Sequence, residues 1–184
     1  ENSRHILSIH MQENLSENQL FAQNKGAIFD WLNKINASSD IWNNRFHSLD
    51  VLKELGNHKM LLVHNTYTKK QDITNNFYCT CPKSNLHIEN ALPNYSIFNE
   101  EKLCVGTDSL ASNNNLSIIE ELEIIQANSK FDLNTLLKIA SKNGAEALGF
   151  KDLGTFKKGK KPGVNLIETK NNRLQKNTKI KVLV

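Results

Sequence analysis

Short apolar runs alternate with longer amphipathic stretches along the first 150 residues of the chain. The runs are short and mostly apolar, a pattern that predicts buried strands. Four such runs occur, at residues 4–10, 59–65, 76–82 and 102–108. Apolar positions at helical spacing predict helices, at residues 16–35, 48–56, 117–129 and 132–149. Apolar strands that alternate with helices are typical of an α/β fold with a parallel sheet covered by helices.

Local signals refine the ends of these elements. Ser16 followed by Gln19 has the spacing of a capping box and predicts the start of the first helix. Pro82 predicts the end of the third strand, and we expect a long Asn-rich loop after it. Residues 150–184 contain period-two segments separated by Gly and Pro, which predict a few antiparallel strands. The sequence therefore predicts an α/β region at residues 1–149, followed by a small β portion.

Composition and charge limit the class of protein. Of the 184 residues, 39% are hydrophobic and 23% are charged, which is typical of a folded domain. No apolar run approaches the roughly 20 residues that span a bilayer, so we expect no membrane association. Ten Lys or Arg and two acids give residues 151–184 a net charge of +8, whereas the whole chain carries +4. Because these cations alternate with Gly, Pro and Asn, we expect a solvated surface and no nucleic-acid partner.

The three cysteines, Cys79, Cys81 and Cys104, lie in apolar stretches. Their odd number and unpaired spacing argue against a disulfide framework and predict buried, reduced thiols in a cytoplasmic protein. Cys79 and Cys81 are also candidate zinc ligands, but the chain has no second cysteine pair to complete such a site. Core thiols are therefore the favoured interpretation.

Three of the four predicted strands end on residues that can bind a metal or carry protons: His10, His64 and Asp108. Because the carboxyl ends of parallel strands meet at one edge of a sheet, we expect these side chains to lie close together. Imidazole and carboxylate ligands suit zinc or iron, and such an ion lowers the pKa of a bound water. Glu13, just beyond His10, is placed to shuttle a proton. A single strand-terminal histidine is more often structural, so the prediction depends on the set of three.

A series of motifs resembles the amidohydrolase superfamily, in particular its deaminase and chlorohydrolase branch. Four segments match barrel strands five to eight of that family in the same order: HMQE at residues 10–13, LLVHN at 61–65, CPKSN at 81–85 and GTDSLASN at 106–113. Two later segments, at residues 136–150 and 153–167, resemble the following helix and the return to a small β-sandwich. The resemblance covers residues 4–168 and implies a (β/α)8 TIM-type barrel fold.

The resemblance also implies a role for each matching residue of the strand ends. His10 and Asp108 would bind one divalent metal ion, with zinc favoured over iron. Asp108 would also act as general base toward the attacking water, and Glu13 would pass its proton to the leaving group. His64 would hydrogen-bond the substrate and polarise the carbon under attack.

Further residues concern the substrate pocket. The resemblance implies that Ser112 and Asn113 shape the pocket wall and that Asn85 fixes the loop after the seventh strand. Trp42 and Phe46, in the loop after the first predicted helix, can stack on a planar base or pack the loop, and packing is favoured. The substrate is therefore expected to be a small heterocycle whose identity the sequence leaves open.

Two departures from the family pattern shape the expectation for the whole chain. The family's His-x-His of the first strand is absent, and KPGVN at residues 161–165 stands where the family has Lys-x-Ala-Asp. We therefore expect the C-terminal half of the barrel, with part of its β-sandwich, taken from a longer protein. Four strands cannot close an eight-stranded barrel, and two ligands hold a metal weakly, so we expect little activity from this part alone. The missing N-terminal half is the expected partner, and pairing of exposed strand edges makes a homodimer possible.

The predicted function is hydrolytic deamination, or dechlorination, of an amino- or chloro-substituted heterocycle by metal-activated water. Within the family, ring opening of hydantoin type is a further candidate, but GTDSLASN favours the mononuclear deaminase and chlorohydrolase group. A non-catalytic α/β scaffold or interaction module, derived from such an enzyme, is the alternative from a different class. The intact Glu13, His64 and Asp108 argue against this alternative.

Overall fold

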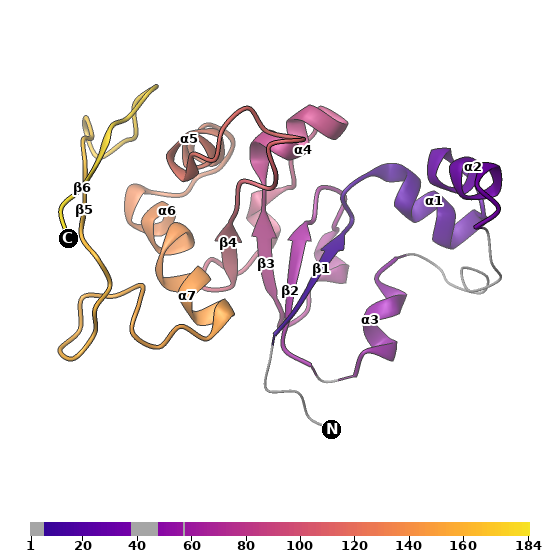
Figure 1. Cartoon of the computed structure of the whole chain (residues 1–184), viewed down its shortest axis with the longest axis horizontal. Coiled ribbons are helices and arrows are strands. Elements are labelled where there is room, and N and C mark those ends of the chain that lie inside the picture. The colour runs from indigo at the N-terminus through magenta and orange to yellow at the C-terminus, as the bar shows by residue number, and fades with distance from the viewer. Residues whose placement is uncertain (1–5, 38–47, 57) are drawn as a thin grey trace.

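A computed structural model describes residues 6–37, 48–56 and 58–184 of the chain. At its centre lies a four-stranded parallel sheet (Figure 1). The strands follow chain order across the sheet: β1 (Leu7–Met11), β2 (Met60–His64), β3 (Phe77–Thr80) and β4 (Leu103–Val105). Each strand pairs with the next in parallel, so all four carboxyl ends lie at the same edge. The predicted α/β fold with a parallel sheet is confirmed.

Helices lie beyond both edge strands of the sheet (Figure 1). They are α1 (Leu15–Gln23), α2 (Ala27–Lys34), α3 (Asp50–Glu54), α4 (Pro82–Glu89), α5 (Ile118–Asn128), α6 (Leu133–Ala140) and α7 (Lys142–Leu148). Two 3-10 turns occupy Lys70–Asp72 and Tyr95–Ile97. In Figure 1, α1 to α3 lie beyond β1, and α5 to α7 lie beyond β4. None of the helices in the described ranges is long and apolar enough to cross a membrane.

The two faces of the sheet bury different side chains, because successive residues of a strand point to opposite faces. One face packs against the helices through a hydrophobic core that includes Leu62, Tyr78, Leu103, Leu122, Ile125 and Leu136. The other face carries a smaller cluster of Phe77, Cys79, Cys81 and Cys104. All three cysteines are buried and free, as the sequence predicted.

The first predicted helix is two helices in the structure. The side chain of Asn14, rather than Ser16, caps α1 by accepting a hydrogen bond from the Glu17 backbone N–H at 3.0 Å. Asn24, with a left-handed φ of 50°, then ends α1, and Gly26 with φ 91° precedes α2. Asn and Gly adopt these angles more readily than other residues, which explains why the helix breaks here. The apolar periodicity continues across the break, so it did not reveal it.

Two further boundaries differ from the prediction. The segment expected to be a loop after the third strand begins with helix α4, in which Pro82 occupies the first turn. Proline lacks the N–H that a first-turn residue leaves unpaired, so Pro82 ends the strand and starts the helix. The helix expected at residues 132–149 breaks at Ser141, which separates α6 from α7.

The last part of the chain forms a separate two-stranded antiparallel sheet of β5 (Asn165–Ile167) and β6 (Ile180–Val182). The antiparallel strands predicted for this part are confirmed. Gln126 of α5 joins this part to the helical layer by two 3.0 Å hydrogen bonds with the backbone of Leu174. The loop that contains Trp42 and Phe46 lies outside the described residues.

Candidate functional site

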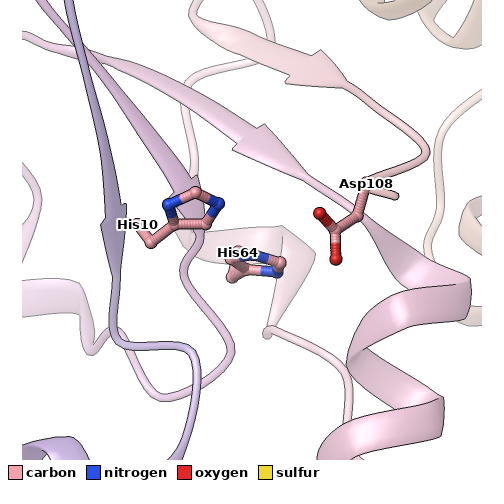
Figure 2. Close-up of side chains that lie close together, drawn as sticks. All are labelled: His10, His64 and Asp108. Atoms are coloured by element: carbon pink, nitrogen blue, oxygen red, sulfur yellow. The ribbon is translucent and has the colours of Figure 1, made fainter. Parts of the chain in front are cut away.

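The carboxyl ends of β1, β2 and β4 bring together His10, His64 and Asp108. His10 lies in β1, His64 is the last residue of β2, and Asp108 follows β4. Figure 2 shows the two imidazole rings and the carboxylate facing a common space. One ligand atom from each residue lies within 4.8 Å of the other two. The rings of His10 and His64 stack, with their centroids 5.2 Å apart.

The backbone at this edge adopts left-handed angles that are rare outside glycine. His64 has φ 75°, Asn65 has φ 58° and Asp108 has φ 57°, while Gln12, next to Glu13, has φ 55°. For His64 and Gln12 such a conformation costs about 1–3 kcal/mol and persists where surrounding contacts hold it, whereas Asn and Asp adopt it more readily. The backbone of His64 in particular is therefore held by its neighbours.

His64 is completely buried and is oriented by Asn85. The Asn85 amide donates from Nδ2 to the His64 carbonyl at 3.4 Å, and its Oδ1 lies 2.8 Å from His64 Nδ1. With Asn85 Oδ1 as the acceptor, Nδ1 of His64 carries a hydrogen and donates it to Asn85. Nε2 has no hydrogen-bond partner in the described part of the chain, and its nearest acidic atom is Glu13 Oε1 at 3.4 Å.

Asp108 receives hydrogen bonds from two serine hydroxyls. Ser84 Oγ lies 2.8 Å from Asp108 Oδ2, and Ser112 Oγ donates to the same oxygen. Partial burial favours the neutral acid, but the hydrogen bonds from Ser112, Ser84 and the Ser109 backbone outweigh it, with a smaller contribution from His64. Together they hold the pKa of Asp108 below its usual range, so the carboxylate is ionised at neutral pH.

Glu13 lies at the rim of the same space. Its side chain is 25% exposed, and its carboxylate faces His64. Glu17, one turn further along the chain, accepts hydrogen bonds from the backbone N–H groups of Gln12 at 2.8 Å and Glu13 at 3.1 Å. The start of α1 thereby fixes the backbone that carries the Glu13 carboxylate.

Ser112 and Asn113 are engaged with protein groups beside the site. The Ser112 hydroxyl bonds to Asp108, while Asn113 Nδ2 donates to the Thr107 carbonyl at 2.8 Å and to Glu121 Oε1 at 2.7 Å. Asn113 therefore anchors the loop after β4 in this structure. The substrate contacts expected of both residues stay predictions.

Sequence reasoning missed the contributions of three residues to this site: it gave no role to two of them and expected the third only to fix a loop. Asn85 orients His64, Ser84 bonds to Asp108, and Glu121 is a fully buried carboxylate of α5. Burial raises the pKa of Glu121, against the opposing hydrogen bonds from the Lys83 backbone and Asn113. The available signal for Glu121 was its position four residues before Ile125, on the apolar face of a predicted helix.

The donor set fits a divalent cation such as zinc or iron. Two imidazoles and one carboxylate are the ligand types that these ions prefer, and catalytic zinc sites use three protein ligands. The buried Nε2 of His64, which lacks a hydrogen-bond partner in the described residues, faces the same space as His10 and Asp108. Within the described ranges, this is the single group of three or more His, Cys, Asp or Glu residues with metal-binding geometry.

Comparison with known proteins places the chain. The model of the amidohydrolase family matches residues 5–184, so the chain belongs to the amidohydrolase family. A 5-methylthioadenosine/S-adenosylhomocysteine deaminase of Halalkalibacterium halodurans is 35% identical in an alignment that covers 47% of this chain and 22% of the relative. The resemblance predicted from the motif series is thereby confirmed.

Solved structures show the same fold. The aminofutalosine deaminase of Helicobacter pylori superposes with a TM-score of 0.72 at 24% identity, over 91% of this chain and 45% of that enzyme. An adenosine deaminase from Xanthomonas campestris with bound zinc gives a TM-score of 0.60 at 24% identity, over 86% and 36% of the two chains. The chain thus spans less than half the length of these relatives.

Proposed function

We propose that this chain is the C-terminal half of a metal-dependent amidohydrolase that deaminates an amino-substituted heterocycle by hydrolysis. Residues 1–149 would form strands five to eight of a (β/α)8 barrel with their helices, and residues 150–184 part of a small β-sandwich. The observation that carries the proposal is the convergence of His10, His64 and Asp108 at the carboxyl edge of the sheet, in a chain of this family. The share of the relatives that the chain spans supports the assignment to half a barrel.

His10 and Asp108 would hold the metal ion, with zinc favoured over iron. The ion supplies a positive charge that makes a water molecule acidic enough to attack near neutral pH. Asp108, kept ionised by its serine partners, accepts a proton of the attacking water. Glu13, whose carboxylate lies 3.4 Å from His64 Nε2, passes one proton of the water to the departing nitrogen. The water oxygen thus bonds to the ring carbon as the C–N bond breaks, ammonia leaves, and the proton held by Asp108 returns to the product.

His64 would bind the substrate rather than the metal. Its buried ring is fixed by Asn85, and its Nε2 faces the space beside Asp108. From this position it would hydrogen-bond the substrate and polarise the carbon under attack. The geometry also supports a ligand role for His64, since one of its ring nitrogens lies within 4.8 Å of a ligand atom of His10 and of Asp108. Metal analysis of a His64→Gln variant separates the two roles.

The missing half of the barrel would complete the site. His10 and Asp108 are two ligands, and the family's His-x-His would supply the others from the upstream segment. The chain alone would hold metal weakly and turn over little substrate. A homodimer through the open edges of β1 and β4 is a lesser possibility for the isolated chain.

The test uses the protein that contains this chain together with its upstream segment. We expect about one metal ion per protein and release of ammonia from an aminopurine, an aminopyrimidine or a triazine, with chloride release tested in parallel. Because the relative with 35% identity is named for deamination of 5-methylthioadenosine and S-adenosylhomocysteine, these two nucleosides begin the screen. An upstream segment without His-x-His, or full activity in metal-free protein, would overturn the proposal.

A further inference from the structure

Glu121 is a buried carboxylate for which the proposed reaction gives no role. It lies in α5, is fully buried, and has apolar neighbours on the same helix in Leu122 and Ile125. The nearby ammonium of Lys83 bonds to Glu120 at 2.6 Å and to Asn115 at 2.9 Å. A buried carboxylate is expensive compared with an apolar residue, so its contacts matter.

The two oxygens of Glu121 hold two separate segments. Oε1 accepts from Asn113 Nδ2 at 2.7 Å, and Oε2 accepts from the backbone N–H of Lys83 at 2.8 Å. The first contact reaches the loop after β4, and the second reaches the first turn of α4. These segments are separate in sequence, and Glu121 joins them from a third element.

Both segments make contacts that hold Asp108 or the residue before it. Asn113 Nδ2 also donates to the carbonyl of Thr107, the residue before Asp108. Ser84, the residue after Lys83, donates its hydroxyl hydrogen to Asp108 Oδ2. Glu121 therefore acts on the backbone of Asp108 through one arm and on its carboxylate through the other. Asp108 has a left-handed φ of 57°, which Asp adopts less readily than Gly, so the contacts on both sides help to hold it.

We propose that Glu121 is a positioning residue, which holds the Asp108 carboxylate in place through Asn113 on one side and the turn of Lys83 and Ser84 on the other. The inference rests on the proposed function in so far as Asp108 is a metal ligand. Groups that orient a ligand from behind typically change metal affinity or activity by about 10–100-fold when they are removed. We expect the same range for Glu121.

The test compares Glu121→Gln with Asn143→Ala in the protein that contains this chain and its upstream segment. Glutamine has the shape of glutamate but one acceptor oxygen, so one of the two arms loses its acceptor. Asn143 is equally buried, but its side chain bonds to the carbonyls of Glu100 and Leu103, at the amino end of β4. Both variants lose buried hydrogen bonds, and only E121Q affects the contacts to Asp108.

Two measurements are made. The first is the dissociation constant of Co²⁺ with its visible absorption spectrum, which reports the ligand geometry. We expect E121Q to raise the constant by about tenfold or more and to change the spectrum, while N143A leaves both as in wild type. The second is a crystal structure of metal-free E121Q, in which we expect the Ser84–Asp108 contact to be lost or Asp108 to leave its left-handed conformation.

The two measurements separate the two proposals. If wild type binds no metal but Asp108 moves in E121Q, the proposed function fails and the positioning role stands. If wild type binds metal and turns over substrate while E121Q leaves Asp108 and the Co²⁺ constant unchanged, the positioning role is wrong. An equal effect of N143A would also overturn it, since the change would then reflect lost stability alone. Should E121Q fail to fold, Asn113→Ala cuts the first arm and keeps the carboxylate, and an unchanged constant there overturns the proposal.

Discussion

At the carboxyl end of the sheet, buried hydrogen bonds hold side chains that can take part in chemistry, whereas at the amino end the buried amide of Asn143, exposed ion pairs and lysine–aromatic contacts hold the fold. Asp108 and His64 have left-handed backbones and buried partners. At the other end, Lys102 Nζ lies 4.1 Å and Lys59 Nζ 4.7 Å from the centroid of the Phe77 ring. Parallel barrels separate function from stability in this way, with chemistry at the carboxyl end. The same sheet thus offers residues whose loss should affect one property and spare the other.

Asp108→Asn should have the largest effect. Asparagine tolerates the left-handed conformation of this position, so we expect the fold to survive. Loss of the charged ligand and base should lower kcat/KM of the complete protein by about 10³-fold or more, since general-base and metal contributions are lost together. Steady-state kinetics with thermal unfolding as the control measures both. Activity within tenfold of wild type would contradict the role of Asp108.

Glu13→Gln should follow. The variant keeps the shape of the side chain near His64 but cannot carry a proton, so we expect kcat to fall by about 10²–10⁴-fold. Metal content should stay at the wild-type value, because Glu13 is outside the proposed ligand set. Glu101→Gln, at the amino end of the sheet, is the matched control and should keep full activity. Equal kinetics of the two variants would remove Glu13 from the mechanism.

Asn143→Ala should show the reverse pattern. Its Nδ2 donates to the carbonyl of Glu100 at 2.6 Å and to that of Leu103 at 2.7 Å, and the side chain is fully buried. Loss of two buried hydrogen bonds should lower the free energy of unfolding by about 2–4 kcal/mol. Chemical denaturation measures this value, and kcat/KM below the unfolding transition should match wild type. A loss of activity in the folded variant would show that the two ends of the sheet are coupled.

Glu101→Gln should have the smallest effect on stability, and the effect should depend on pH. A hydrogen bond from Lys142 and the charges of Lys142 and Lys138 lower the pKa of Glu101 in the folded chain. A lowered carboxyl pKa stabilises the fold above the unfolded value, and the stabilisation is lost as the pH falls through the folded value. The variant should therefore melt slightly below wild type near about pH 7, and the difference should disappear once the pH is below the folded pKa of Glu101. A difference in Tm that persists at low pH would assign the effect to packing instead.

Local pattern was sufficient to predict the sheet but not every helix boundary. Runs such as MLLVH are apolar throughout and short, which favours a buried strand over a helix, so four strands and their parallel arrangement could be predicted from the sequence. The helix expected at residues 16–35 failed at Asn24 and Gly26, because the apolar spacing continued across residues that prefer left-handed angles. Helix α4 was missed because Pro82 was interpreted as a stop for the strand and not also as a start for the helix.

The candidate site also combines features that the sequence predicted with contacts that the structure alone revealed. The sequence by itself determined that His10 and His64 lie near the ends of strands, because strand periodicity and the family motifs are properties of short segments. The fourth strand was predicted to end on Asp108, but β4 ends at Val105, three residues earlier. Only the tertiary structure decided what holds these three side chains. The Asn85–His64, Ser84–Asp108 and Glu121–Lys83 hydrogen bonds join residues 21, 24 and 38 positions apart. Such contacts form when separate strands and helices pack, so no local pattern of apolar and polar residues specifies them.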